Sequence, residues 1–268
     1  MKNLTIVVCA SLVPDPLQTL EPAGTNAAPA LKNELMLPGV LDPWAACALY
    51  EAAAIAKKRP GTRVVLVSLG PKQKLQQLMM NVAQKAPFEL VAVNAPAGGF
   101  NDAKSVAAAL AAAIKTIPNL DLASTLLFGG CASASRDAGL VVQFVAEGLG
   151  IGELFMAVDE LTLADDGALE VLERVEGGKY LKSKCTALPA AVAWATGSLP
   201  EPPNNPMVGM QNMRTLMPAL AKAQTADVGL GTIAYESLAV PSAKRDTKVV
   251  KDMPADEIAK EIVAWIKQ

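Results

Sequence analysis

Short apolar runs alternate with longer helical patterns through the first half of the chain, and this alternation constrains the fold more than any other feature of the sequence. Short continuous apolar runs predict buried strands, whereas apolar residues that recur every three or four positions predict helices. Such alternation is typical of βαβ units, so we expect an α/β protein with a mostly parallel sheet and helices on both faces. The expected strands are residues 4–10, 63–69, 89–94 and 124–128, and the expected helices are residues 44–58, 72–84, 103–116 and 137–148.

The second half of the chain has a different pattern. Two runs flank Gly177 and Gly178 and predict a hairpin, because paired glycines can adopt the positive φ of a tight turn. Residues 188–196 predict one more buried strand, after which the sequence becomes rich in proline and then helical. We therefore expect an α/β core over residues 1–196 and a C-terminal docking loop and partner-gripping arm over residues 197–268.

Three shorter segments carry their own signals. Residues 18–40 contain prolines and polar residues without a sustained period, so we expect a long loop or irregular ribbon there. The glycines of "GLGIG" (148–152) follow a helix and predict a C-cap and a turn. Residues 253–268 predict an amphipathic last helix, whose apolar residues share one face at i, i+4, i+7 and i+8: Ile258, Ile262, Trp265 and Ile266.

The composition excludes several classes of function. The chain of 268 residues contains no histidine, which removes Ser-His-Asp and Cys-His nucleophiles and most catalytic metal sites. A net charge of −2 and 4% aromatic residues argue against nucleic-acid binding. Cys9, Cys47, Cys131 and Cys185 lack the C-x-x-C spacing of zinc or redox sites, so redox chemistry would need a bound cofactor. The N-terminal apolar run ends at Pro14, too short for a membrane span, and we expect a cytoplasmic protein.

One loop has the composition of an anion-binding site. The stretch "LLFGGCASASRDAGLVVQFVAEGLG" (126–150) places glycine, serine and alanine between an apolar run and an amphipathic helix. Such a joint gathers backbone N–H groups at a helix N-terminus, where the helix dipole favours negative charge. Cys9 and residues 68–71 also follow strands, and ligands of open parallel sheets sit at such strand ends. The loop predicts either a phosphate site or ordinary tight turns, and the chain contains no G-x-G-x-x-G or P-loop motif.

Six motifs follow one another along the chain: "VVCASLVPDP" (7–16), "LDPWAACALYEAAAIAKK" (41–58), "VVLVSLGP" (64–71), the loop over 129–140, "RVEGGKY" (174–180) with "LPAAVAW" (188–194), and "LPEPPNNPMVGM" (199–210). Taken in this order, they resemble the β subunit of electron transfer flavoproteins. The resemblance implies a Rossmann-like, adenine nucleotide alpha hydrolase-like core that binds a nucleotide, plus the C-terminal arm. It also implies pairing with an α subunit that carries most of the FAD site, and AMP or a second FAD at the strand ends of the β subunit.

The same resemblance implies nucleotide contacts from strand ends, from a helix start and from the loop. The implied residues are Cys9, Asp42, Pro43, Trp44, Ala45, Leu69, Gly129, Gly130, Cys131, Ala132, Ser133, Ala134, Ser135, Arg136, Asp137, Ala138, Gly139 and Leu140.

The chain departs from the family's usual pattern at this site. Ala134, Ser135 and Arg136 stand where the family usually has aspartates, and Asp42 stands where it usually has asparagine. If the family's contacts are backbone N–H groups, the site is preserved and Arg136 can strengthen phosphate binding. If the lost side chains contact the ribose or base, the site binds weakly, binds another ligand or is empty. Trp44 either stacks on an adenine or packs the first helix, and Arg136 alternatively is a solvated residue.

The resemblance implies an electron-carrier subunit rather than a stand-alone catalyst. It would pass electrons from a flavin dehydrogenase to an acceptor through FAD, with no side chain acting as acid, base or nucleophile. An adenine-nucleotide-binding module without a redox role, or an interaction protein with an empty site, are the alternatives. Methionines recur at near-helical spacing in the C-terminal part, where they form either a partner-docking face or a core-facing stripe: Met207, Met210, Met213 and Met217.

Overall fold

The chain forms two units, which we describe separately. A computed structural model describes residues 4–96, 99–135, 137–240, 247 and 249–267. The first unit spans Met1–Leu238 and the second spans Ala239–Gln268.

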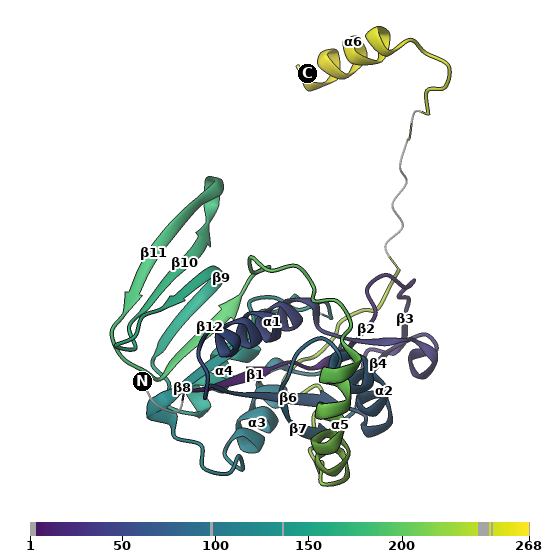
Figure 1. Ribbon diagram of the computed structural model, residues 1–268. Coiled ribbons are helices and arrows are strands. Elements are labelled where there is room, and N and C mark those ends of the chain that lie inside the picture. The colour runs from purple at the N-terminus through teal and green to yellow at the C-terminus, as the bar shows by residue number, and fades with distance from the viewer. Residues whose placement is uncertain (1–3, 97–98, 136, 241–246, 248, 268) are drawn as a thin grey trace. The chain divides into compact units, whose positions relative to one another are not determined.

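A nine-stranded sheet forms the centre of the first unit, in the order β11-β10-β9-β12-β8-β1-β6-β7-β13 (Figure 1). Neighbouring strands from β9 to β13 in this order are parallel, and β10 and β11 extend the sheet as an antiparallel hairpin. The strands are β1 (Thr5–Cys9), β6 (Arg63–Gly70), β7 (Glu89–Asn94), β8 (Thr125–Gly130), β9 (Glu153–Leu163), β10 (Leu169–Val175), β11 (Lys179–Cys185), β12 (Ala190–Trp194) and β13 (Gln224–Thr225).

Helices cover both faces of this sheet and enclose two hydrophobic cores. Successive side chains of a strand point to opposite faces, so Ile6 and Val8 of β1 enter one core while Val7 and Cys9 enter the other. The predicted α/β, Rossmann-like architecture is therefore confirmed (Figure 1). One face carries α1 (Pro43–Lys58), α2 (Lys72–Val82) and α5 (Pro206–Ala221), and the other carries α3 (Ala103–Ile114) and α4 (Val141–Gly148).

The helix expected at residues 137–148 is wrong at its start, because α4 begins at Val141. Asp137 has φ 55° and Gly139 has φ 61°, and this left-handed conformation cannot continue a right-handed helix. The other three expected helices begin within one residue of the prediction, although α2 and α3 each end two residues earlier. The four expected strands are present as β1, β6, β7 and β8.

The expectation of a long loop over residues 18–40 is wrong in part. That segment contains a small hairpin, a 3-10 helix and a strand that pairs with the segment after β1. The elements in and next to residues 18–40 are β2 (Leu12–Pro14), β3 (Pro22–Thr25), β4 (Ala28–Leu31), η1 (Glu34–Met36) and β5 (Gly39–Leu41).

The strand β9 was not predicted at all, although it has eleven residues. Two further 3-10 turns are η2 (Leu122–Ser124) and η3 (Glu176–Gly178).

The predicted hairpin and the predicted C-cap are confirmed. Gly177 and Gly178 lie between β10 and β11 with φ 73° and 69°. Gly150 has φ 72°, and the N–H of Ile151 donates to the carbonyl of Ala146 at 2.8 Å, which closes the end of α4. The predicted strand at 188–196 is β12.

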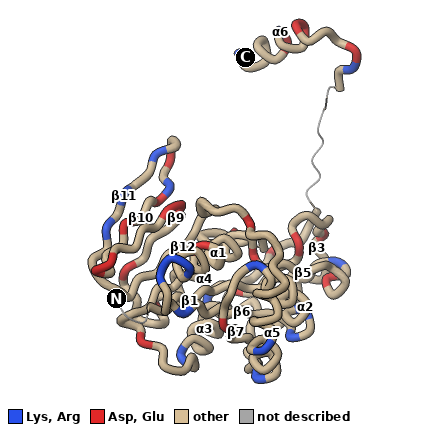
Figure 2. Tube along the Cα trace, viewed as in Figure 1, with Lys and Arg blue, Asp and Glu red and all other residues tan. Residues whose placement is uncertain are grey.

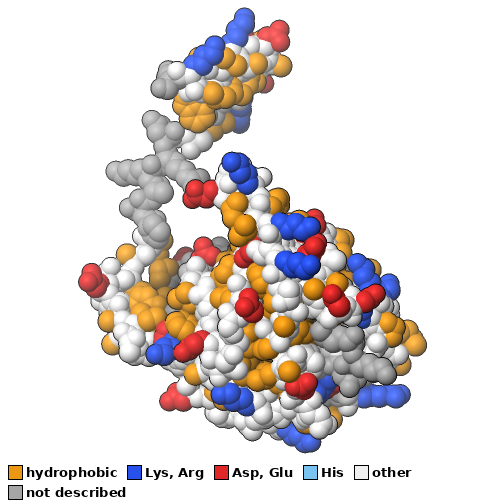
Figure 3. Space-filling model, turned by 90° about the vertical axis from the view of Figure 1, so that its left-hand side faces the viewer, with side chains coloured by type: hydrophobic (Ala, Val, Ile, Leu, Met, Phe, Trp, Pro, Cys, Tyr) orange, Lys and Arg blue, Asp and Glu red, His pale blue; other side chains and the backbone are white. Residues whose placement is uncertain are grey.

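The hairpin is charged along its length, and side chains as well as the β10–β9 ladder join it to the rest of the sheet. Figure 2 shows basic and acidic residues following one another along β10 and β11, and Figure 3 shows such charges beside exposed apolar side chains on that side of the molecule. The guanidinium of Arg174 donates two bonds to the carboxylate of Asp159, at 2.8 and 2.9 Å. The hydroxyl of Tyr180 donates to the same carboxylate at 2.9 Å. The "RVEGGKY" motif therefore holds the hairpin on β9.

Helix α5 belongs to the first unit, although it lies within residues 197–268, which were expected to form the docking loop and arm. Leu216 and Leu220 are buried in the same core as α1 and α2. Asn205 caps the helix start through the N–H of Met207 at 3.0 Å, and Pro206 takes the first helical position. The functional division at residue 196 stays a prediction.

The second unit contains the predicted amphipathic helix, α6 (Ala255–Ile266). Its apolar residues, including Ile258, Ile262 and Trp265, are exposed. No helix within the described part of the chain is both long enough and apolar enough to cross a bilayer.

Candidate functional site

The strand order of the sheet reverses beside β1. From β1 the chain builds β6 and β7 on one side and then returns to place β8 on the other. In open parallel sheets, ligand crevices lie at the carboxyl ends of the strands at this point. A crevice of about 100 Å³ opens there, lined by the ends of β1, β6 and β8 and by parts of α3 and α4.

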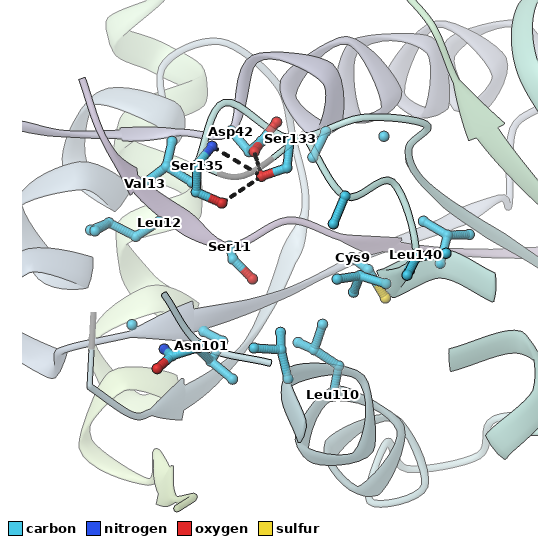
Figure 4. Close-up of a pocket in the computed structure, with 18 of the residues that line it drawn as sticks. Cys9, Ser11, Leu12, Val13, Asp42, Asn101, Leu110, Ser133, Ser135 and Leu140 are labelled. Carbon is cyan, nitrogen blue, oxygen red and sulfur yellow. Dashed lines mark hydrogen bonds between the residues drawn. The ribbon is translucent and has the colours of Figure 1, made fainter. Parts of the chain in front are cut away.

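Asp42 provides the charged group of this crevice (Figure 4). It is the N-cap of α1, and Pro43 follows it at the first helical position. One carboxylate oxygen accepts the N–H of Trp44 at 3.2 Å. The other accepts the hydroxyl of Ser133 at 2.8 Å and the N–H of Ala134 at 3.0 Å. Asp42 therefore joins the start of α1 to the loop that follows β8.

Burial raises the pKa of Asp42. The residue is 5% exposed. Desolvation raises its pKa above the usual value, and the hydrogen bonds from Ser133, Ala134 and the start of α1 act in the opposite direction. The carboxylate is thus held by neutral donors in a site that disfavours its charge.

The loop after β8 uses several of its own backbone N–H groups. Cys131 donates to the carbonyl of Trp194 at 2.8 Å, and Asp137 donates to the carbonyl of Ser133 at 2.9 Å. Ser135 donates its N–H to the Ser133 hydroxyl at 3.2 Å, and their two hydroxyls lie 2.8 Å apart. Some of the loop N–H groups that could bind a phosphate therefore already donate to acceptors within the chain.

Close packing explains the glycines of this loop. A Cβ on Gly130 would lie 2.5 Å from the Cβ of Trp44, so α1 approaches β8 only because this position has no side chain. A Cβ on Gly129 would collide with Val142 of α4. Gly139 has φ 61°, and a Cβ there would collide with the carbonyl of Cys131. These glycines are needed to bring two helix N-termini to one strand end.

The opposite wall of the crevice is apolar and ends at the start of α4. Val106 and Leu110 of α3 line it together with Leu140 and Val142 (Figure 4). Among the side chains that the structure describes, none caps the start of α4, and the first N–H groups of a helix have no partner within the helix. The crevice therefore has an open helix N-terminus on one side and a carboxylate on the other.

Cys9 lies at the end of β1 in the crevice wall. It is 5% exposed, and burial raises the pKa of its thiol to about 12. A thiol with this pKa stays protonated at neutral pH and is a poor nucleophile. Among the described residues, no group of three or more His, Cys, Asp and Glu side chains is placed to hold a metal ion.

The sequence model of the electron transfer flavoprotein domain matches residues 33–228. The chain belongs to the electron transfer flavoprotein family. It is also similar to the caffeyl-CoA reductase-Etf complex subunit CarD of Acetobacterium woodii, with 27% identity over 187 residues that cover 69% of this chain and 67% of that protein. Family membership supports a role in electron transfer with a flavin as cofactor.

The crevice brings together many of the residues implied by the family resemblance. Those that line it are Cys9, Asp42, Ala45, Leu69, Gly130, Ala132, Ser133, Ser135, Ala138, Gly139 and Leu140. Pro43, Trp44, Gly129, Cys131, Ala134 and Asp137 lie behind or beside the lining, and Arg136 lies outside the described residues. The role of each as a nucleotide contact stays a prediction.

Two polar residues of the lining were not predicted. Ser11 lies two positions beyond the end of β1, and Asn101 lies in the segment between β7 and α3 (Figure 4). Ser11 follows an apolar run directly, so the rule that selected Cys9 could have found it. Asn101 belongs to no motif, and only the fold brings it to the crevice.

A second hollow lies beside α5. Gly209, Asn212, Leu216 and Leu220 turn toward the core, and the opposite side of the helix is exposed. Met207 and Met210 are 64% and 66% exposed, and Met217 is 44% exposed. The core-facing alternative is thus wrong for these three, whereas Met213 packs against the core. Met80 and Gln84 complete the hollow, which has a volume of about 690 Å³.

Proposed function

We propose that this chain is the β-type subunit of an electron transfer flavoprotein heterodimer. It would pair with an α-type subunit that holds most of the FAD, and the pair would carry electrons from a flavin dehydrogenase to an acceptor. The family match over residues 33–228 carries this proposal. The similarity to a subunit of an Etf complex supports the pairing.

The chain's own part in this function is binding and positioning. Flavin, when bound, supplies the electron-transfer chemistry. The protonated thiol of Cys9 and the hydrogen-bonded carboxylate of Asp42 are not arranged as a nucleophile and its base. The chain would shape one side of the flavin pocket, bind a nucleotide of its own and present a docking surface.

The crevice beside β1, where the strand order reverses, is the proposed site of that nucleotide, which would be AMP or a second FAD. The open N-terminus of α4 and the small residues of the loop fit an adenine nucleotide. The volume of about 100 Å³ is below the roughly 300–1,000 Å³ of ordinary ligand pockets. The crevice would therefore enclose one part of the nucleotide.

The methionine-lined hollow on α5 is the proposed docking surface for the donor dehydrogenase. Methionine side chains adapt to varied partner surfaces because they are flexible and polarizable. Met207, Met210 and Met80 are exposed there, with Arg214 at the edge. Residues 197–268 would thus contribute the docking surface through α5 and an arm that grips the partner through α6.

One observation favours a second function, an adenine-nucleotide-binding module without a redox role. The loop lacks the acidic residues usual in the family, and Asp42 is bonded to the N–H of Ala134 in their absence. A module of this kind would keep the crevice and dispense with the flavin partner.

Co-expression with an α-type subunit distinguishes the two functions. We expect the two chains to co-purify as a complex that contains tightly bound FAD, measured by size-exclusion chromatography and by the visible absorbance of flavin. A colourless monomer that binds AMP and ignores both FAD and the α-type subunit would support the nucleotide module. A colourless monomer that binds neither AMP nor FAD would overturn both.

A further inference from the structure

Asp42 is a buried charge without a described cation beside it. The hydroxyl of Ser133 and backbone N–H groups, including those of Trp44 and Ala134, donate to it, and all of them are neutral. Among the described residues that line the crevice, Asp42 is the one with a charged side chain. The acidic residue of the loop itself, Asp137, is exposed.

This carboxylate occupies the place that a bound anion would take on the loop. The hydroxyl of Ser133 points to it (Figure 4). The N–H of Ala134 donates to the same carboxylate oxygen. A phosphate that used these donors would have to displace Asp42 and leave its charge buried and unpaired. Ribose hydroxyls and the adenine amino group are donors, by contrast, and a carboxylate has spare acceptor positions for them.

We propose that Asp42 makes the crevice select the uncharged adenosine part of its ligand against a phosphate group. The proposal rests on the function proposed above, in which the crevice holds an adenine ligand. Asp42 is then the residue that determines the charge accepted by the site. The anionic part of a longer ligand would lie away from the loop at residues 133–134.

The opposing effect is the open N-terminus of α4, which attracts anions. At an exposed helix end this attraction corresponds to about a two- to fivefold gain in affinity. Two full negative charges held within one small crevice, at an effective dielectric constant of about 20, repel each other by more than this gain. Repulsion by Asp42 therefore outweighs the helix dipole for a phosphate confined to the same small crevice.

Calorimetric titration of the full chain with adenosine and with AMP tests the proposal, in complex with the α-type subunit if the two co-purify. We expect the wild-type chain to bind adenosine at least as tightly as AMP. In Asp42→Asn the affinity for AMP should rise about tenfold or more, while the affinity for adenosine changes less than about threefold. A rise for both ligands equally would overturn the proposal.

Asp121→Asn is the matched control. Asp121 also accepts the N–H two residues ahead, at 3.1 Å, and its substitution changes the net charge equally at the opposite end of the sheet. Both affinities should stay at the wild-type level in this variant. Equal gains for AMP in the two variants would show a general charge effect and overturn the role of Asp42.

The titrations separate failure of this inference from failure of the proposed function. If AMP binds the wild-type chain tenfold or more tightly than adenosine, the inference fails while the nucleotide site stands. If neither ligand binds the wild-type or the variant chain, the inference fails together with the proposed nucleotide site. The proposed heterodimer is then tested separately, by whether the two chains co-purify with bound FAD. Should circular dichroism show Asp42→Asn to be unfolded, the wild-type comparison decides: binding of adenosine at least as tight as that of AMP supports the inference, and tenfold tighter binding of AMP overturns it.

Discussion

Charged side chains have opposite surroundings at the two ends of the central sheet. At the carboxyl end, Asp42 is buried and bonded only to neutral donors. At the amino end, Arg63 forms a two-bond pair with the partly exposed Glu89, at 2.6 and 2.8 Å, and donates to the carbonyl of Pro118. Exposed ion pairs cost little and contribute little, whereas an unpaired buried charge is expensive and marks a candidate functional site. Burial without an ion pair thus distinguishes Asp42 from the charged residues at the amino end of the sheet.

The largest expected effect is that of Asp42→Ala on stability. The substitution leaves the N–H groups of Trp44 and Ala134 and the hydroxyl of Ser133 without their acceptor. Each buried donor left unsatisfied costs about 1–3 kcal/mol, and part of this cost is recovered because a buried charge is removed. We expect a net loss of about 2–4 kcal/mol in the free energy of unfolding, measured by urea denaturation.

Asp121→Ala sharpens this comparison from the other end of the sheet. It removes a carboxylate with the same capping role from an exposed turn, and caps of this kind are worth about 1 kcal/mol. Equal losses for the two variants would show that Asp42 is an ordinary helix cap and that the two ends do not differ.

The next largest effect is expected from Gly130→Ala. The new methyl group would lie 2.5 Å from the Cβ of Trp44 and 3.1 Å from the N of Ala45, so α1 would have to move away from β8. Overpacking of this kind costs about 1–3 kcal/mol. Gly152→Ala is the matched control, because a Cβ there has no neighbour within 4 Å among the described residues. A loss in the control as large as that in Gly130→Ala would contradict the packing argument.

The sequence predicts the sheet better than it predicts the site. Apolar runs are local signals, and they predicted the positions of β1, β6, β7 and β8 with small errors. The start of α4 was missed because Asp137 and Gly139 adopt left-handed conformations, which a helical period does not reveal. These conformations depend on how the loop packs in the folded chain.

The chemistry of the crevice depends on contacts between distant segments. Asp42 and Ser133 are 91 positions apart, and only the fold shows that their side chains are bonded. The family resemblance named both residues but not this bond, and it treated the loop's backbone N–H groups as free for a ligand. The methionines of α5 show the same limit, since their spacing alone fitted a buried and an exposed face equally.

A smaller effect is expected at the amino end from Arg63→Ala. Its partner Glu89 is about half exposed, and exposed ion pairs contribute about 0–1 kcal/mol. We therefore expect a loss of at most about 1 kcal/mol in the free energy of unfolding. The loss should shrink between low salt and about 1 M NaCl, where the Debye length falls to about 3 Å. A loss as large as that in Asp42→Ala, independent of salt, would contradict the distinction between the two ends.

The smallest effect is the pH dependence of stability that Asp42 contributes. Burial raises the pKa of Asp42 in the folded chain above its usual 3.8, so the folded state binds this proton more tightly than the unfolded state. The stabilisation is fully present below the unfolded pKa and is lost as the pH rises through the folded pKa. The free energy of unfolding of the wild type, relative to that of Asp42→Asn, should therefore fall as the pH rises from below 3.8 toward neutrality. Urea denaturation of both chains at each pH measures this difference, because groups common to the two cancel. A rise over the same range would mean that the hydrogen bonds outweigh desolvation and stabilise Asp42 as an anion. The carboxyl end of the sheet would then carry its negative charge at no cost, like the paired carboxylate at the amino end.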